Sequence, residues 1–226
     1  MTAVYRTALG GDFDNLHPNL QWRYSIDSAS GVAQMVSGIM DSVYCSPKLP
    51  GPVKSFHRRR HSLAIRSSRL VPFEQGNYCY RDELGRECLA VLRTFGFGPG
   101  DQYLNSVLVD DPTGLVDYFG DGPEYLYPIT PSVTVDGGLL LETGPMRWTS
   151  TVGPNIGLRG LLELSMRYRE WWQDDEDRFR CEAVVTNPII GEVFHYRGWF
   201  TAVDRPCTIG DIPDEAWPLR LERRTH

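Results

Sequence analysis

The sequence lacks the short motifs that carry most enzyme chemistry. It has no nucleophile elbow, phosphate loop, metalloprotease helix or calcium-binding loop. The segment Gly96–Gly100 is glycine-rich, but no Lys-Ser/Thr pair follows it and no helix is expected after it. We interpret this segment as a strand connection. These absences exclude the common nucleotide-binding and nucleophile-based classes, so we expect no cofactor and no metal.

The sequence also lacks paired cysteines and long apolar runs, and its acidic residues outnumber its basic ones. The five cysteines are scattered without a C-x-x-C pair, which favours reduced thiols and argues against a zinc site. The N-terminus has no apolar core typical of a signal peptide, and no run approaches the roughly 18 apolar residues of a membrane span. A net charge of −6 disfavours nucleic acid as a partner. We therefore expect a soluble, cytoplasmic protein without nucleic-acid or membrane partners.

One basic segment, Phe56–His61, departs from this acidic balance. Its arginines and histidines could contact an anion, but a solvated strand or turn is the simpler interpretation. His57 and His61 stand four residues apart, and in the extended conformation expected here that spacing places them about 13 Å apart. A shared metal ion is therefore not expected.

The chain of 226 residues is predicted to form a single domain, residues 1–226. Near-helical spacing of Tyr5, Leu9, Phe13 and Leu16 predicts an N-terminal helical segment over residues 1–30. From Gly31 the apolar period changes to two, which predicts strands over residues 31–203. Residues 204–226 are proline-rich and are expected to form a tail that packs outside.

Several local patterns predict how the strands are arranged. The three prolines within Ser46–Pro52 predict an extended loop, and Phe56–Arg69 is predicted to be one long strand or two short ones. The pair Gly137-Gly138 between two apolar runs predicts a hairpin whose turn holds both glycines at positive φ. Short turns of this kind make the sheet antiparallel.

About eight to ten strands follow from this pattern. An open sheet of that width leaves long edges, and closure removes them. The predicted fold is therefore mainly β, an antiparallel, lipocalin-like β-barrel with an N-terminal helical segment. A two-sheet sandwich is the alternative.

Polar and aromatic side chains inside apolar strands are the candidate functional residues, because a buried charge needs a partner. The candidates for catalysis are Arg93, Glu142, Tyr118, Glu182 and Tyr196. The candidates for substrate binding are Tyr168, Trp171, His195, Trp148 and Tyr103. The alternative for each residue is that its side chain faces solvent, since a register error of one residue reverses every face.

Two segments resemble an uncharacterised family of bacterial β-rich domains. The first is the opening Tyr5-x-x-x-Leu9-Gly10-x-Asp12-Phe13-x-x-Leu16-His17-Pro18. The second is the closing Asn187-Pro188-x-x-Gly191-x-x-Phe194-x-Tyr196-x-Gly198. With weaker matches between them, the resemblance spans roughly residues 5 to 200. It implies a single β-rich domain and supplies no reaction. A looser similarity, in fold and composition only, is to Diels–Alderase-like β-barrel cyclases of polyketide biosynthesis.

Two classes of function fit these expectations. The first is a cofactor-free cyclase or isomerase that folds a linear, polyketide-like substrate inside an aromatic-lined barrel, because pre-ordering the reacting ends lowers the barrier without any motif. The alternative is a non-catalytic, lipocalin-like binder of an apolar small molecule. A structural module with a filled interior is the third interpretation. The sequence also leaves it open whether the protein forms a homodimer. An inward polar group in a perturbed environment distinguishes the first class from the second.

Overall fold

The computed structural model describes residues 2–98, 100–122, 125–149 and 156–217. Three short helices come first, α1 (Val4–Leu9), η1 (Gly10–Asn15) and α2 (Pro18–Arg23), and a fourth, α3 (Gly51–Arg59), follows the first strand. The barrel strands are β1 (Val32–Cys45), β2 (Ser68–Arg81), β3 (Glu87–Phe95), β4 (Gln102–Asp111), β5 (Gly114–Phe119), β6 (Tyr125–Val133), β7 (Leu139–Thr143), β10 (Ser165–Gln173), β11 (Arg178–Asn187) and β12 (Gly191–Pro206). Two-residue strands β8 (Arg147–Trp148) and β9 (Ile156–Gly157) and the short helices η2 (Gly160–Leu162), η3 (Ile209–Asp211) and η4 (Asp214–Ala216) complete the set.

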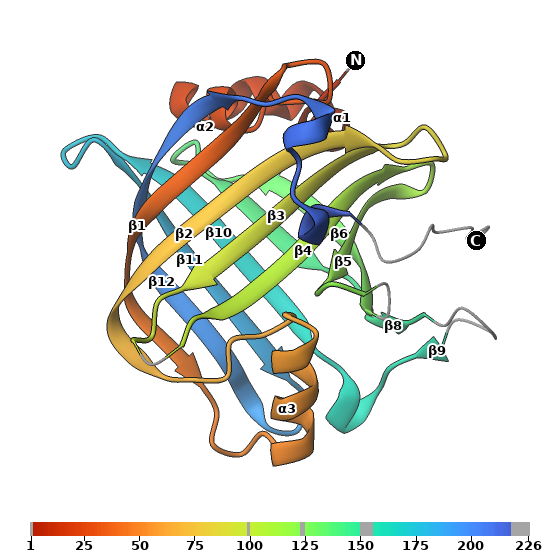
Figure 1. The fold of residues 1–226 in the computed structure, drawn as a ribbon, viewed down its shortest axis with the longest axis vertical. Coiled ribbons are helices and arrows are strands. Elements are labelled where there is room, and N and C mark those ends of the chain that lie inside the picture. The colour runs from red at the N-terminus through yellow and green to blue at the C-terminus, as the bar shows by residue number, and fades with distance from the viewer. Residues whose placement is uncertain (1, 99, 123–124, 150–155, 218–226) are drawn as a thin grey trace.

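The strands form one antiparallel sheet that closes on itself. Its order is β5-β4-β3-β2-β1-β12-β11-β10-β7-β6, with β8 and β9 attached beyond β6. Pairing of β5 with β6 joins the two edges, with Val116 opposite Pro128 and Phe119 opposite Tyr125. The predicted closed antiparallel barrel is therefore confirmed (Figure 1). Closure satisfies the backbone groups that an open sheet would leave at its edges.

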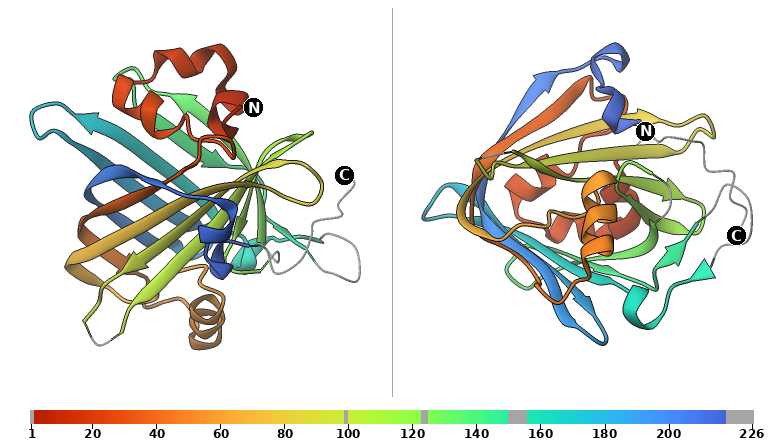
Figure 2. Two further views of the ribbon diagram at one scale, coloured as in Figure 1. Left: turned by 45° about the horizontal axis from the view of Figure 1, so that its top comes forward. Right: turned by 60° about the horizontal axis from the view of Figure 1, so that its bottom comes forward.

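Helices lie across both ends of the barrel. Figure 2 shows α1, η1 and α2 at one end and α3 at the other. The N-terminal segment contributes buried Tyr5, Phe13, Leu20 and Tyr24 to the core inside the barrel. None of the helices in the described part of the chain is long and apolar enough to cross a bilayer.

The expectation of strands over Phe56–Arg69 is wrong for most of that segment. Residues Gly51–Arg59 form helix α3, and β2 begins only at Ser68. The helix starts inside the proline-rich stretch, because Pro52 stands in its first turn, where no intrahelical N–H bond is lost. The prolines therefore mark the start of a helix and not a continuous loop.

The predicted hairpin at Gly137-Gly138 is present between β6 and β7, but its turn differs from the expected one. Only Gly137 has a positive φ, 74°. The loop is longer, and the Thr134 N–H donates to the Gly138 carbonyl at 2.8 Å. Gly138 instead permits a close approach to the backbone of β10, since a Cβ there would lie 2.9 Å from the Glu170 carbonyl oxygen.

The described part of the C-terminal tail, which ends at Trp217, packs on the outer face of the barrel. The Tyr80 hydroxyl donates to the Ala216 carbonyl at 2.9 Å, and the Tyr80 and Trp217 rings lie 4.3 Å apart. A second apolar cluster forms there, outside the barrel, and includes Tyr118 and Ile212.

Candidate functional site

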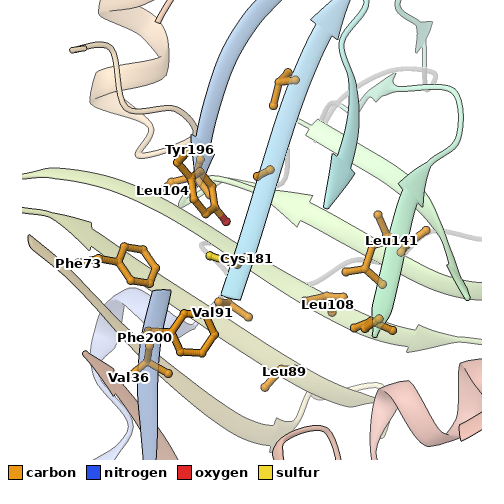
Figure 3. Packing of buried hydrophobic residues seen from close by; sticks show 14 of the residues in the cluster. Val36, Phe73, Leu89, Val91, Leu104, Leu108, Leu141, Cys181, Tyr196 and Phe200 are labelled. Atoms are coloured by element: carbon orange, nitrogen blue, oxygen red, sulfur yellow. The ribbon is translucent and has the colours of Figure 1, made fainter. Parts of the chain in front are cut away.

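The interior of the barrel holds a cavity between the two helical ends. Most of its wall is apolar, and Figure 3 shows four of the lining residues, Leu104 and Leu108 of β4, Leu141 of β7 and Tyr196 of β12, among the buried hydrophobic side chains. The space between the lining atoms is about 910 Å³ when its opening to solvent is counted, but the centre of a water molecule can reach only about 60 Å³ of it. The barrel is therefore not solid, because space remains between its inward side chains.

A buried ion pair lies in the wall of this cavity. Arg23, at the end of α2, places its Nε 2.5 Å from Oε1 of Glu170 on β10. The exposed fractions of these residues are 3% and 0%. The hydroxyl of Tyr168 donates to the other Glu170 oxygen, and the Tyr24 hydroxyl also hydrogen-bonds this carboxylate. Burial disfavours the charge on Arg23, but the adjacent Glu170 outweighs that effect and raises the pKa of Arg23.

One nitrogen of Arg23 is left without a hydrogen-bond acceptor, while the guanidinium carbon lies 4.8 Å from the centre of the Phe200 ring. Nη1 is fully buried and makes no hydrogen bond to any described residue. The residue lines the cavity. A buried guanidinium N–H without an acceptor costs about 1–3 kcal/mol or more, so such groups in native proteins call for an explanation. Nη1 can therefore donate to an acceptor atom held in the cavity.

A second polar group lies on β3, β4 and β5. Asp117 is 4% exposed, and its carboxylate is hydrogen-bonded to Ser106. Arg93 donates from Nη1 to the Leu104 carbonyl at 3.3 Å and to the Ser106 hydroxyl at 3.4 Å. The Oδ1 atom of Asp117 has no hydrogen-bond partner among the described residues. A second unpartnered polar atom thus belongs to a residue of the cavity wall.

Burial governs the protonation of Asp117. Loss of hydration raises the pKa of this carboxyl to about 7, although Arg93 and the Ser106 hydrogen bond act in the opposite direction. A carboxyl group in this range exchanges its proton near neutral pH, as a general acid or base must. Asp117 lines the same cavity as Arg23 and Glu170, so the two polar groups belong to one chamber.

Aromatic residues surround the cavity at the α3 end. His57 of α3 is 4% exposed, stacks on Tyr125 with ring centroids 5.6 Å apart, and pairs its Nδ1 with the Ser62 hydroxyl at 2.9 Å. Burial lowers the pKa of His57 to about 4, so the ring is neutral at physiological pH. Phe56 and Trp148 pack beside Tyr125, which makes this end of the chamber aromatic.

Three of the ten residues predicted from the sequence line the cavity. They are Arg93, Tyr168 and Tyr196. Trp148 lies next to it, in contact with Tyr125 and Phe56. Whether any of them contacts a substrate stays a prediction.

The remaining six residues lie away from the cavity, and the expectation that they face inward is wrong. Glu142, Glu182, Trp171, His195 and Tyr103 are on the outer faces of their strands, and Tyr118 is buried under the C-terminal tail. Alternation explains this: Leu141, Ala183 and Tyr196, each next to one of these residues, take the inward positions. Glu142 pairs outside with Arg167 at 3.7 Å, and His195 pairs with Glu192 at 2.6 Å.

The sequence interpretation missed Arg23, Glu170 and Asp117. Glu170 is in phase with Met166 and Tyr168 on β10, which is the signal that could have identified it. Asp117 likewise shares a face with Leu115 and Phe119 on β5. Arg23 gave no such signal, because it lies in a short helix that only the tertiary structure brings to the cavity.

Comparison with known proteins places the chain in a family. Residues 16–200 match the Domain of unknown function (DUF4166). The chain is also 25% identical over 212 residues to the uncharacterized protein YndH of Bacillus subtilis (strain 168), a match that covers 91% of this chain and 99% of the relative. No solved structure matches it significantly. The resemblance to an uncharacterised bacterial family is thereby confirmed, and the chain belongs to the DUF4166 family.

Proposed function

We propose that the barrel binds a small, largely apolar organic molecule through a neutral oxygen acceptor such as a carbonyl group. The observation that carries this proposal is Arg23, which lines the cavity and whose Nη1 has no hydrogen-bond acceptor among the described residues. An apolar pocket with a few well-placed polar groups is the usual design of a small-molecule site. A filled structural module would not need a buried donor without an acceptor.

The charge balance favours a neutral ligand group over a carboxylate. Glu170 already compensates Arg23, at 2.5 Å. An anion placed beside Nη1 of Arg23 would also lie close to the Glu170 carboxylate, and like charges repel most strongly in an apolar chamber. A carbonyl or ether oxygen accepts the hydrogen bond without that penalty.

A matched pair of probes tests this proposal. Benzaldehyde and toluene have nearly the same shape, but only benzaldehyde has an oxygen acceptor. We expect benzaldehyde to bind on the order of 10- to 100-fold more tightly, since a hydrogen bond from a charged donor contributes about 1.5–3 kcal/mol. The measurement is the ligand-dependent rise of the unfolding temperature, checked by equilibrium dialysis.

Two variants make the test specific. Arg23→Lys keeps a cation for Glu170 but has no Nη1, so it should remove the preference for benzaldehyde. Leu108→Phe fills the cavity and should weaken both probes, whereas Val184→Phe, between inward-facing Ala183 and Val185, should weaken neither. Equal binding of the two probes to the natural chain would contradict the proposal.

A cofactor-free isomerase or cyclase is the second candidate function, and the observation that favours it is Asp117. Its Oδ1 lacks a protein partner in a chamber that also holds an Arg23 donor. The ionised carboxylate would remove a proton from the carbon next to a carbonyl and return it to a more distant alkene carbon, while Nη1 of Arg23 stabilises the oxyanion formed between the two steps. Reactant and product have the same mass. A linear polyketide substrate stays a prediction of the sequence.

Conversion of cyclohex-3-en-1-one to the conjugated cyclohex-2-en-1-one tests for this activity, because the product absorbs in the ultraviolet. We expect the natural chain to accelerate the conversion above the buffer rate and Asp117→Asn to abolish the acceleration while still binding benzaldehyde. If Asp117→Asn is as active as the natural chain, Asp117 is not the proton acceptor and binding without catalysis is the better conclusion.

A further inference from the structure

Positive charge is concentrated in one segment of this acidic chain. Residues 42–73 contain seven Lys and Arg residues and no Asp or Glu. The whole chain has a net charge of −6, so the remaining residues sum to −6 − 7 = −13. The segment and the rest of the chain therefore carry net charges of opposite sign.

The fold places this segment at one end of the barrel. It runs from the end of β1 through α3 to the start of β2, where Val43 pairs with Ser68 (Figure 1). Arg58 and Arg59 of α3 are exposed. The acidic hairpin turns Asp82-Glu83 and Asp174–Asp177 lie at the opposite end, after β2 and β10.

The charges at one end of the barrel have little electrostatic effect on a surface at the other end. A strand of 14 residues such as β1 spans roughly 40 Å, whereas charges in physiological salt are screened over about 8 Å. An anionic surface close to α3 therefore meets the basic end and is largely shielded from the acidic one. Exposed Asp101 and Glu192 lie at the same end and offset part of the seven positive charges, which still outnumber them.

Exposed apolar side chains accompany the basic charges at this end. Leu70 is 69% exposed near the start of β2, and Ile189 is 65% exposed in the turn between β11 and β12. Leu162 of η2 is 59% exposed, and η2 is held to that turn by a hydrogen bond from Asn187 to the Gly160 carbonyl at 2.9 Å. Surfaces that combine arginines with exposed leucine and isoleucine side chains are typical of proteins that bind at a lipid–water interface.

We propose that the α3 end of the barrel docks on an anionic lipid bilayer. Juxtaposed basic and apolar side chains match the phosphate groups and the outer acyl region of such a surface. The absence of an apolar span, on which the expectation of no membrane partner was based, does not bear on surface binding. His57 of α3 lines the cavity, so docking would bring that end of the chamber to a source of apolar molecules. The surface proposal is independent of the ligand proposal.

Vesicle co-sedimentation of the full chain tests it. We expect binding to vesicles of phosphatidylcholine with 30% phosphatidylglycerol, little binding to pure phosphatidylcholine, and release by 0.5 M salt. Arg58→Gln/Arg59→Gln should weaken binding about thirty-fold, because each basic residue near an anionic surface contributes about 1 kcal/mol. The matched control Arg81→Gln/Arg205→Gln removes the same charge from exposed sites near the opposite end and should bind like the natural chain.

Two results would overturn the proposal that the α3 end binds lipid. If the basic end serves an acidic protein, vesicles will not retain the natural chain at any anionic fraction, and the proposal fails. Equal weakening by both double variants would also overturn it, since that result reports overall charge and not the α3 end. Circular dichroism of each variant confirms that it is folded, and the comparison of vesicle compositions stands without any variant.

Discussion

Asp117 and Glu170 are both buried carboxyl groups in one chamber, but their surroundings differ. Glu170 accepts from Arg23 at 2.5 Å and from the Tyr168 hydroxyl. Asp117 has Ser106 as a partner for its carboxylate, while its Oδ1 has none. The carboxylate of Glu170 thus has direct partners on both oxygens, whereas Asp117, with a pKa of about 7, sits near the balance between its charged and neutral forms.

Replacing Asp117 by Asn should change how stability depends on pH. Burial raises the pKa of Asp117 from about 4 to about 7, so the folded state binds one more proton than the unfolded state between these values. Stability contributed by this group therefore falls as pH rises from 4 to 7. Asp117→Asn removes this loss, up to about 4 kcal/mol at pH 8. Urea unfolding of both proteins at pH 4 and pH 8 measures this change in the free energy of unfolding. An equal effect of the substitution at both pH values would contradict the raised pKa of Asp117.

Breaking the Arg23–Glu170 pair should be strongly destabilising. Glu170→Gln leaves the Arg23 guanidinium buried without a countercharge, a change that typically costs about 3–5 kcal/mol. Glu142→Gln is the matched control, because the Glu142–Arg167 pair is exposed and such pairs contribute less than about 1 kcal/mol. Denaturant unfolding of both variants gives the two values. Similar losses would mean that the buried pair has no special role.

Residues of the site were only partly predictable from the sequence. Alternation in β3 and β12 placed Arg93 and Tyr196 among inward apolar residues, but the same reasoning selected Glu142, which lies one position from inward Leu141. A single-residue shift separates the two outcomes, and nothing in a short run such as Leu139–Thr143 fixes it. Pairing with β10 fixes it in the folded chain, where Leu141 lies opposite Tyr168.

At the scale of elements, β1 and β12 depend on two glycines where their backbones approach closely. A Cβ on Gly198 would lie 2.2 Å from the Ile39 carbonyl oxygen, and one on Gly38 would lie 2.1 Å from the Trp199 carbonyl oxygen. The register between the strands shifts nearby, between Met40 and Ser42. These glycines therefore permit a local irregularity in the longest strand pair of the barrel.

Gly198→Ala should consequently destabilise the barrel by several kcal/mol, since the colliding atoms belong to backbone and cannot rotate away. Gly11→Ala is the control, because a Cβ there has open space and an ordinary φ. Thermal unfolding of the two variants is the measurement. A tolerated Gly198→Ala would show that β1 and β12 can separate without loss of the fold.

The sequence was a good guide to the hairpins and a poor one to α3. Strands with alternating apolar residues, such as β10 and β11, show their period locally. Helix α3 has only nine residues, and two prolines flank or enter its first turn, so its local pattern resembles a loop. Its packing against Tyr125 and Trp148, which are distant in the sequence, is what the local pattern does not contain.

At the scale of the whole molecule, a barrel closed by β5 and β6 and covered by helices at both ends removes its interior from bulk water. Two titratable groups on different elements, His57 of α3 and Asp117 of β5, experience this loss of hydration in opposite ways. Burial lowers the pKa of His57 to about 4 and raises that of Asp117 to about 7. Burial disfavours the charged form of both groups, as expected in a chamber of low polarity.

Their contributions to stability should therefore oppose each other in mildly acidic solution. The unfolded state binds a proton at the histidine below pH 6.5, so the His57 contribution is present at neutral pH and is lost as pH falls toward 4, by roughly 3 kcal/mol in full. The Asp117 contribution increases over the same fall. His57→Gln should leave a profile that loses less stability on acidification than the natural chain, and Asp117→Asn one that loses more. Unfolding free energies at intervals from pH 4 to pH 7 give the difference profiles. A parallel displacement of either variant's profile would mean that the group stays accessible to water and that the chamber is not sealed.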